Sequence, residues 1–409
     1  MHILWIKTEL LHPIDKGGRI RTYNMLAALK REHRVTYLSL SDGTERDDDV
    51  ARASVYCDTL VRVPFRAAAK PSIAFWADVA RNTASPLPYV IARYRSAEMR
   101  ARITQLVRDT GADLVVCDFL TPAVNVPDGL GVRTALFQHN VEAMIWERHA
   151  ELAKNPAARA YMAEQARRMR RFEGQQCRRF DHVVAVSEQD ADVMRRRYGV
   201  AAVSAVPTGV DTNFFTPRGE TRDGRDVVFV GSMDWMPNDD GAAWFVDAIF
   251  PSIRRAVPDA TFTIVGRNPT PRVRELADRV PGLRVTGTVA DVRPYLERAA
   301  AVVVPLRVGG GTRLKIYEAL AMERPVVSTT IGAEGLPVRH GEHILLADDP
   351  DRFASEVVAL LQNPARGDRL GAAAAAYVRS EFGWDRVAAR FAEVCAGVSL
   401  LPTPTLAAS

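Results

Sequence analysis

The residues best suited to binding or catalysis follow an apolar run that ends at Pro305. A triple glycine is followed by two cations and a carboxylate, on what should be the start of a helix. Glycines let a phosphate lie against main-chain N–H groups, and the helix adds the positive end of its dipole. The cations can neutralise a departing diphosphate, and the carboxylate can accept hydrogen bonds from ribose hydroxyls. The alternative is a flexible loop before a solvated helix. The residues concerned are Gly309, Gly310, Gly311, Thr312, Arg313, Leu314, Lys315 and Glu318.

Two smaller groups lie in the first half of the chain. Gly17 and Gly18 precede an amphipathic stretch, so they predict a second helix start that a diphosphate could approach. The alternative is an ordinary glycine turn, because neither GxGxxG nor GxxxxGK[ST] occurs. His139 ends an apolar run, where it could hydrogen-bond a sugar or position the reacting centre. A lone histidine is more often structural, and Glu142 is its one obvious carboxylate partner.

Apolar, β-branched runs alternate with amphipathic stretches along the whole chain. Most of the runs are continuously apolar, which is typical of parallel strands covered on both faces. The alternation predicts an α/β fold with two doubly wound sheets. The expected strands are 2–6, 35–40, 114–117, 134–137, 182–186, 227–230, 261–265, 284–288, 301–305, 325–329 and 344–347, and the expected helices include 20–30, 240–255, 351–361 and 384–398.

Turn-forming residues indicate how the chain divides. Proline and glycine occur at 206–211, and a polar stretch at 216–225 precedes a new strand. We expect a first domain over 1–210, a second over 211–378, and a final segment, 379–409, whose helix crosses back to the first domain before a tail. Ligands of open α/β sheets bind beyond the carboxyl ends of the strands, where the candidate loops should lie.

Composition excludes several classes of protein. The formal net charge of +5, with 25% charged residues, lacks the dense basic patches of a nucleic-acid-binding protein but suits an anionic ligand or membrane surface. The four cysteines form no CxxC pair, so we expect neither zinc nor a disulfide framework, and they suit a reducing compartment. No signal peptide and no apolar run of about 18 residues is present. We therefore expect a cytoplasmic protein.

A predicted helix over 161–180 is rich in arginine. One interpretation is a solvated helix with i,i+4 pairs to Glu164 and Glu173. The other is peripheral contact with anionic lipid at the inner membrane face, or with a lipid-diphosphate acceptor. The arginines are Arg167, Arg168, Arg170, Arg171, Arg178 and Arg179.

The glycine-rich segment 309–318, with the residues that follow it to Thr329, resembles the donor loop of the retaining GT-B glycosyltransferases often called GT4, or group 1. Supporting matches occur in the expected order along nearly the whole chain. They are Val184-Ala-Val-Ser187-Glu188, Val206-Pro-Thr-Gly-Val-Asp-Thr-Asn-Phe-Phe215, Val228-Phe-Val-Gly231 and Phe262-Thr-Ile-Val-Gly-Arg267.

The resemblance implies two Rossmann-like domains that face a central cleft, with a nucleotide diphosphate sugar bound mainly by the second. It implies sugar transfer with retention of configuration, without a metal or another cofactor. Gly17-Gly18 falls at the family's phosphate loop and His139 at its cleft histidine, and Gly231 and Arg267 join the donor-binding set. We expect His139, Arg313 and Lys315 to be the catalytic residues.

The chain departs from the family pattern at two places. The family usually has two glutamates separated by seven residues, but Gly310 occupies the first position and Glu318 the second. The usual arginine and lysine after the second domain's first strand are replaced by Gly231-Ser-Met-Asp-Trp-Met-Pro-Asn238. We expect Arg313 and Lys315, with Arg267, to supply the phosphate charge instead.

Two other functions fit the same fold. A silent nucleotide-sugar-binding or scaffold protein is suggested by Gly310, and a nucleotide-sugar epimerase would need an acid/base pair around the sugar. The nucleotide base, the sugar and the acceptor (a glycan, a lipid-linked saccharide or a small molecule) are left open. Acceptor choice should lie in loops of the first domain such as 68–94, which contains Trp76 and Tyr89.

Overall fold

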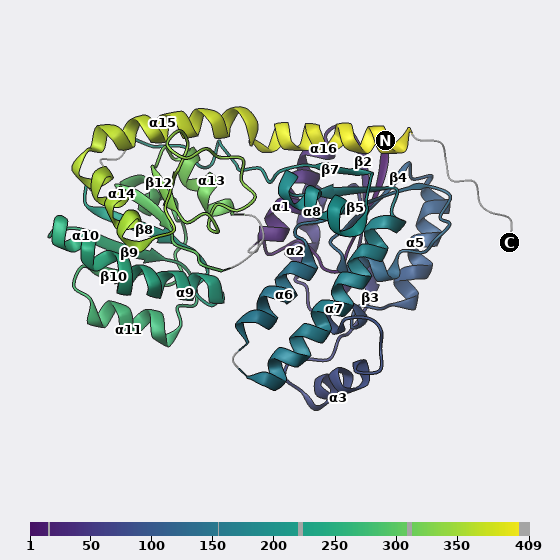
Figure 1. The fold of residues 1–409 in the computed structure, drawn as a ribbon. Helices are drawn as coiled ribbons and strands as arrows, with labels where there is room; N and C mark the ends of the chain where they lie inside the picture. Colours follow the sequence, from purple (N-terminus) through teal and green to yellow (C-terminus); the bar gives the residue numbers. More distant parts are fainter. Residues whose placement is uncertain (15–16, 154, 220–223, 309–312, 401–409) are drawn as a thin grey trace. The chain divides into compact units, whose positions relative to one another are not determined.

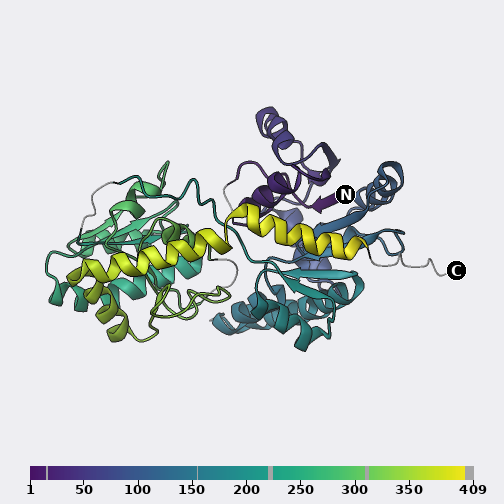
Figure 2. The same ribbon diagram turned by 90° about the horizontal axis from the view of Figure 1, so that it is seen from above.

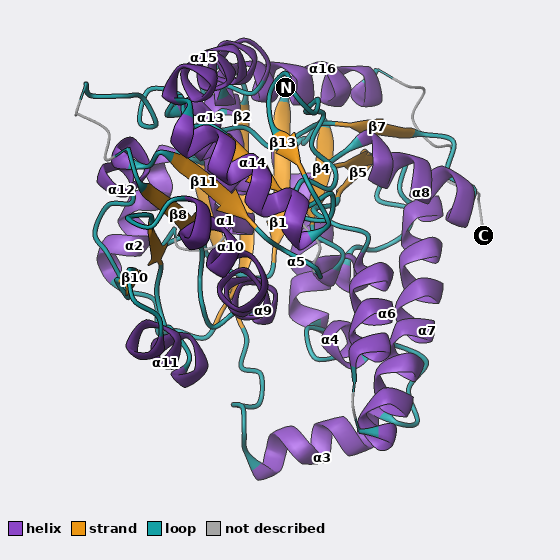
Figure 3. Cartoon of the chain, turned by 60° about the vertical axis from the view of Figure 1, so that its left-hand side comes forward, coloured by secondary structure: helices purple, strands orange, loops and turns teal. Residues whose placement is uncertain are grey.

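The computed structural model describes residues 1–14, 17–153, 155–219, 224–308 and 313–400 (Figure 1). The chain forms two compact units, one of Met1–Pro207 with the chain from Asp385 onward, the other of Thr208–Trp384. Each unit contains one parallel sheet with helices packed against it (Figure 3). The predicted α/β class with two doubly wound sheets is confirmed.

The first unit holds a seven-stranded sheet in the order β3-β2-β1-β4-β5-β6-β7. The continuous apolar runs become its inner strands, and all six residues of β1 are buried. The patterns did not predict β3 or β7, since β3 is an edge strand exposed along much of its length and β7 has only three residues. The strands are β1 His2–Lys7, β2 Arg34–Ser41, β3 Thr59–Pro64, β4 Leu114–Asp118, β5 Arg133–Phe137, β6 His182–Ala185 and β7 Val203–Ala205.

The last helix completes the core of the first unit. Phe391 of this helix packs against Trp5 and Phe137, with ring centroids 5.6 and 4.9 Å apart. Figure 2 shows the helix, α16, beside the N-terminus. The helices of this unit are α1 Gly17–Leu29, α2 Asp47–Ala51, α3 Ile73–Asn82, α4 Tyr89–Ala92, α5 Ala97–Thr110, α6 Glu142–Leu152, α7 Pro156–Arg179, α8 Glu188–Tyr198 and α16 Trp384–Ser399, with 3-10 turns η1 Arg52–Val55 and η2 Thr121–Asn125.

The second unit holds a six-stranded sheet in the order β10-β9-β8-β11-β12-β13. Its core is built from the apolar strands and from the inner faces of the helices on either side. The strands are β8 Asp226–Val230, β9 Thr261–Val265, β10 Leu283–Val285, β11 Ala301–Val304, β12 Val326–Ser328 and β13 Leu345–Leu346. The helices are α9 Met236–Trp244, α10 Phe250–Ala256, α11 Pro271–Arg279, α12 Arg293–Arg298, α13 Leu314–Ala321, α14 Pro350–Gln362 and α15 Pro364–Glu381.

The expected single helix over 240–255 is wrong in one respect. A π-helical segment, η3 Phe245–Ile249, separates α9 from α10. Pro251, near the start of α10, has no N–H to continue the helical ladder, and the wider turn takes up the break.

The helices of the structure can be compared with the length and hydropathy of a membrane-spanning helix. Across the described ranges, no helix has both the length and the apolar character that crossing a bilayer requires.

Candidate functional site

Lys315, on α13, occupies the carboxyl edge of the second unit's sheet. Its Nζ donates a hydrogen bond to Asn238 Oδ1 at 2.7 Å and lies 4.7 Å from the centre of the Phe229 ring. A Cβ atom on Gly231 would lie 2.8 Å from this Nζ and 2.7 Å from Asn238 Nδ2. The absence of a side chain at Gly231 therefore gives the ammonium group room at the end of β8.

A chain of hydrogen bonds links this lysine to Arg267. Asn238 Nδ2 donates to the carbonyl of Ser232 at 2.8 Å, and Arg267 Nε lies 2.6 Å from Ser232 Oγ. Ser232 follows β8 and Arg267 follows β9, so adjacent parallel strands present both residues at one edge. The Ser232–Asn238 segment, which lacks the family's usual cations, instead fixes the position of Lys315.

Arg313, Leu314 and Glu318 complete this group. Arg313 is buried at the start of α13, and its Nη2 donates to the carbonyl of Ile331. Glu318 lies one turn further along, half-buried, and no described residue donates a hydrogen bond to its carboxylate. The predicted Gly309, Gly310, Gly311 and Thr312 lie outside the described residues.

The surroundings of this site shift the pKa values of Lys315 and Glu318. Burial, with the neighbouring Arg313, lowers the pKa of Lys315 to about 7. Burial raises the pKa of Glu318 to about 7, although Lys315 opposes the change. The site therefore holds a desolvated cation beside an acceptor for hydroxyl groups, which matches the two ends of a nucleoside diphosphate.

In the first unit, Gly18 and His139 lie together. A Cβ atom on Gly18 would lie 2.8 Å from Phe119 Cζ and 3.9 Å from His139 Nδ1. Phe119 stacks on His139 with ring centroids 3.8 Å apart, and its backbone has φ +74°, a region that bulky residues rarely adopt. Gly17 and Gly18 form the first residues of α1, so the helix begins three residues earlier than the expected 20–30.

The expectation that only Glu142 could partner His139 is wrong. His139 Nε2 lies 2.7 Å from Oδ1 of the buried Asp118. Asp118 is the last residue of β4, and His139 follows β5, the parallel strand beside it. Burial alone would raise the pKa of Asp118, but Lys7 and His139 hold it well below its usual range. Burial lowers the pKa of His139 to about 3 despite Asp118.

These interactions fix the hydrogen-bonding role of His139. An ionised Asp118 can only accept, so Nε2 of the neutral ring carries the proton. Nδ1, on the side of Gly18, is then an acceptor suited to a ligand hydroxyl. Asp118 Oδ2 is held by three further donors, namely Lys7 Nζ, Thr22 Oγ1 and Trp5 Nε1 at 2.8, 2.6 and 3.0 Å.

The arginines of α7 are held largely by the protein itself. Arg167 and Arg168 pair with Glu164 as expected, and Arg170 pairs with Glu147. The expected pairing with Glu173 is wrong, because Glu173 is fully buried and accepts hydrogen bonds from the N–H groups at the start of α6 and from the hydroxyl of Tyr198. Arg178 and Arg179 donate to carbonyl groups of neighbouring segments, and lipid contact through α7 stays a prediction.

Comparison with known proteins agrees with this architecture. The family model described as Glycosyltransferase Family 4 matches residues 16–214, and that described as Glycosyl transferases group 1 matches residues 224–363. The chain belongs to the GT4-like, group 1 glycosyltransferases.

Among curated relatives, the phosphatidyl-myo-inositol mannosyltransferase of Mycobacterium leprae is 30% identical over 224 residues, which are 52% of this chain and 58% of that protein. The D-inositol 3-phosphate glycosyltransferase of Thermobispora bispora is 31% identical over 216 residues, 47% of this chain and 50% of that protein. The chain thus matches less than two thirds of the length of these relatives.

Solved structures match over nearly the whole chain. A glycosyltransferase from Rickettsia africae has a TM-score of 0.69 at 14% identity, covering 98% of this chain and 99% of that one. HepE of Anabaena in complex with UDP has a TM-score of 0.68 at 14% identity, covering 97% and 100%. The fold is therefore GT-B, with two Rossmann-like units.

Proposed function

We propose that this protein transfers a sugar from a nucleotide diphosphate sugar to an acceptor, with retention of the anomeric configuration and without a metal. The observation that supports it best is the ammonium of Lys315, held by the neutral Asn238 at the edge where parallel sheets bind ligands. Arg313 and Arg267 add positive charge, and Glu318 provides the acceptor for ribose. The donor-binding set is Gly17, Gly18, Gly231, Arg267, Gly309, Gly310, Gly311, Thr312, Leu314 and Glu318.

In the proposed reaction the bond between the anomeric carbon and the diphosphate oxygen breaks as the acceptor oxygen bonds to the same face. The acceptor proton passes to the departing phosphate. The acceptor oxygen is itself the nucleophile, and no carboxylate of the protein forms a covalent intermediate. Arg313 and Lys315 stabilise the negative charge that develops on the diphosphate. His139, through Nδ1, accepts a hydrogen bond from a sugar hydroxyl and orients the ring.

The nearest guide to the acceptor comes from the names of the relatives. These proteins are named for glycosyl transfer to phosphatidyl-myo-inositol or to inositol 3-phosphate. We propose an acceptor of that general kind, a polyol or saccharide that carries an anionic group.

A donor screen tests the proposal. The purified protein is incubated with UDP-, GDP-, ADP- and dTDP-sugars and a total lipid and saccharide extract, and release of nucleoside diphosphate is measured with and without EDTA. We expect release from one donor, unchanged by EDTA. Nucleotide binding without any release would favour a silent binding protein, and exchange of solvent deuterium into the donor sugar would favour an epimerase.

Replacing Glu318 with alanine is expected to weaken nucleoside diphosphate binding roughly 10–100-fold, because two hydroxyl hydrogen bonds to a charged acceptor are lost. Isothermal titration calorimetry measures the change. Glu334→Ala, on the segment after β12, is the control. An unaltered affinity in Glu318→Ala would remove the ribose assignment.

Donor affinity is expected to depend on pH with a maximum near 7. The ammonium form of Lys315 is lost as pH rises through its pKa of about 7, and the ionised form of Glu318 is lost as pH falls through about 7. Affinity for a nucleotide sugar, whose phosphates stay ionised, should fall roughly tenfold from pH 7 to 8.5. Lys315→Met should remove the alkaline decline and Glu318→Gln the acid one; a flat wild-type profile would contradict both assignments.

A further inference from the structure

The outer face of α3 is apolar and exposed to solvent. Ile73 is 91% exposed and Trp76 is 61% exposed. Ala77 and Ala80 are exposed at the next positions of the same face, so the spacing is i, i+3, i+4 and i+7. A surface helix normally carries its charged residues there, and α3 reverses that pattern.

The exposure is not caused by a loosely held helix. Phe75, on the inner side, packs edge-on against Tyr89 of α4 with ring centroids 5.6 Å apart. Arg168 of α7 donates to the carbonyls of Asn82 and Thr83 at the end of α3. The helix is fixed at its middle and its end, and Figures 1 and 3 show it at the edge of the first unit beside one end of α7.

The segment of chain that carries this face is basic. From residue 65 to residue 95 the only acidic side chain is Asp78, which pairs with Arg81. Lys70 is exposed just before the helix, and Arg66 is exposed four residues earlier. The basic side chains of this segment are Arg66, Lys70, Arg81, Arg93 and Arg95.

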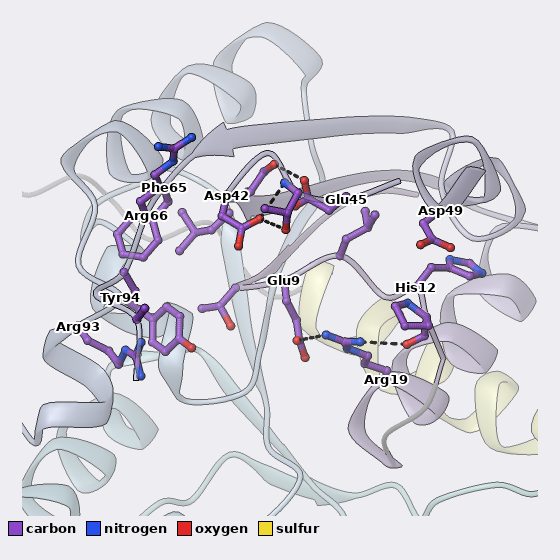
Figure 4. A pocket seen from close by; sticks show the side chains of 18 of the residues that line it. Glu9, His12, Arg19, Asp42, Glu45, Asp49, Phe65, Arg66, Arg93 and Tyr94 are labelled. Carbon is purple, nitrogen blue, oxygen red and sulfur yellow. Dashed lines mark hydrogen bonds and ion pairs between the residues drawn. The ribbon is translucent and has the colours of Figure 1, made fainter. Parts of the chain in front are cut away.

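A pocket of about 820 Å³ adjoins α3, because the segment from Phe65 to Lys70 lines it and leads into the helix. The pocket lies at the carboxyl ends of β1, β2 and β3. Figure 4 shows Phe65, Arg66, Arg93 and Tyr94 together at one end of it, whereas the carboxylates Glu9, Asp42, Glu45 and Asp49 line the rest of the pocket. Three of these carboxylates are paired with arginines, Glu9 with Arg19, Glu45 with Arg62 and Asp49 with Arg46. The rings of Phe65 and Tyr94 stack 6.1 Å apart, which provides an apolar surface beside two cations.

We propose that α3 docks the first unit onto an anionic lipid surface, with Ile73 and Trp76 in the interfacial layer and Lys70 and Arg66 against the headgroups. The adjoining pocket then receives the polar part of an acceptor displayed by that surface, with its anionic group at the end where Arg66 and Arg93 lie, so the acceptor is a lipid-linked, anionic molecule. An exposed tryptophan and isoleucine flanked by basic residues are the composition that interfacial helices use. The acceptor class rests on the proposed function, whereas the docking surface does not.

Vesicle flotation tests the docking surface. The full chain is mixed with vesicles of phosphatidylcholine alone, or with 30% phosphatidylglycerol (about the anionic content that attracts basic segments), and the co-floating fraction is measured. We expect binding to the anionic vesicles. The double variant Ile73→Ser/Trp76→Ser should lower the partition coefficient at least about tenfold. Lys70→Glu/Arg66→Glu should remove the preference for anionic vesicles.

Matched controls are Val55→Ser, an exposed apolar residue of the same unit, and Arg108→Glu on α5; both should bind as the wild type does. Equal binding by wild type and Ile73→Ser/Trp76→Ser would overturn the proposal. Self-association of the wild type in sedimentation, abolished by the same substitution, would also overturn it, because the face would then bind a second copy of the chain. Nucleotide affinity, measured in parallel, separates this failure from failure of the proposed function, because none of the proposed donor-binding residues lies on α3.

Discussion

Replacing Lys315 with methionine should lower kcat/KM for the donor about 10³-fold, because the transition state loses one preorganised cation that stabilises the negative charge developing on the diphosphate. The ammonium is held by the neutral Asn238 rather than by a carboxylate, so its charge is available to the diphosphate. Methionine keeps the length and apolar stem of the side chain and removes only the charge. Steady-state release of nucleoside diphosphate measures the effect.

Two further variants separate charge from packing. Arg272→Met removes an exposed cation that pairs with Asp239 and should leave turnover unchanged. Gly231→Ala keeps Lys315 but places a methyl group 2.8 Å from its Nζ, so it should also impair turnover by displacing the lysine. If Lys315→Met turned over within a factor of about three of the wild type, a role in leaving-group stabilisation would be untenable.

Replacing Asp118 with alanine should destabilise the first unit by about 3–5 kcal/mol, because the buried Lys7 loses its partner. For a unit of this size the loss corresponds to a fall in Tm of about 6–20 °C in differential scanning calorimetry. Asp128→Ala, which removes an exposed partner of Arg179, is the control and should shift Tm by less than about 2 °C.

A milder substitution separates the charge of Asp118 from its role as hydrogen-bond acceptor for His139. In Asp118→Asn the amide oxygen can still accept from His139, but the charge that Lys7 requires is absent. The variant should therefore lose both stability and turnover, and ¹⁵N chemical shifts of the imidazole should report whether Nε2 keeps its proton. Wild-type stability in both Asp118 variants would contradict the network.

Most of the fold could be predicted because its inner strands are continuous apolar runs. The two strands that escaped prediction lack that signal, since Thr59–Pro64 contains Arg62 on an exposed edge and Val203–Ala205 is too short to show a pattern. The break between α9 and α10 had a signal in Pro251, which lies inside the expected helix.

The sequence indicated that the candidate residues lie after strands or at helix starts, but it did not indicate their pairings, and their roles stay predictions. Asp118 ends β4, directly after the apolar run 114–117, which is a recognisable signal, yet only the parallel register of β4 and β5 brings it beside His139. Asn238 lies within the segment that was noted for its missing cations, but its contact with Lys315 spans 77 residues and depends on the packing of α9 and α13. Long-range partners of this kind follow from topology, not from local spacing.

The packing of Phe391 against Trp5 has a consequence for biosynthesis. Residues from the two ends of the sequence share one core, so the first unit is discontinuous along the chain. At about 5–20 residues per second, a ribosome adds Phe391 roughly 20–80 s after Trp5, so for that time Trp5 lacks this part of its packing. The second unit is contiguous and can complete its core first, which reverses the usual N-to-C order of maturation.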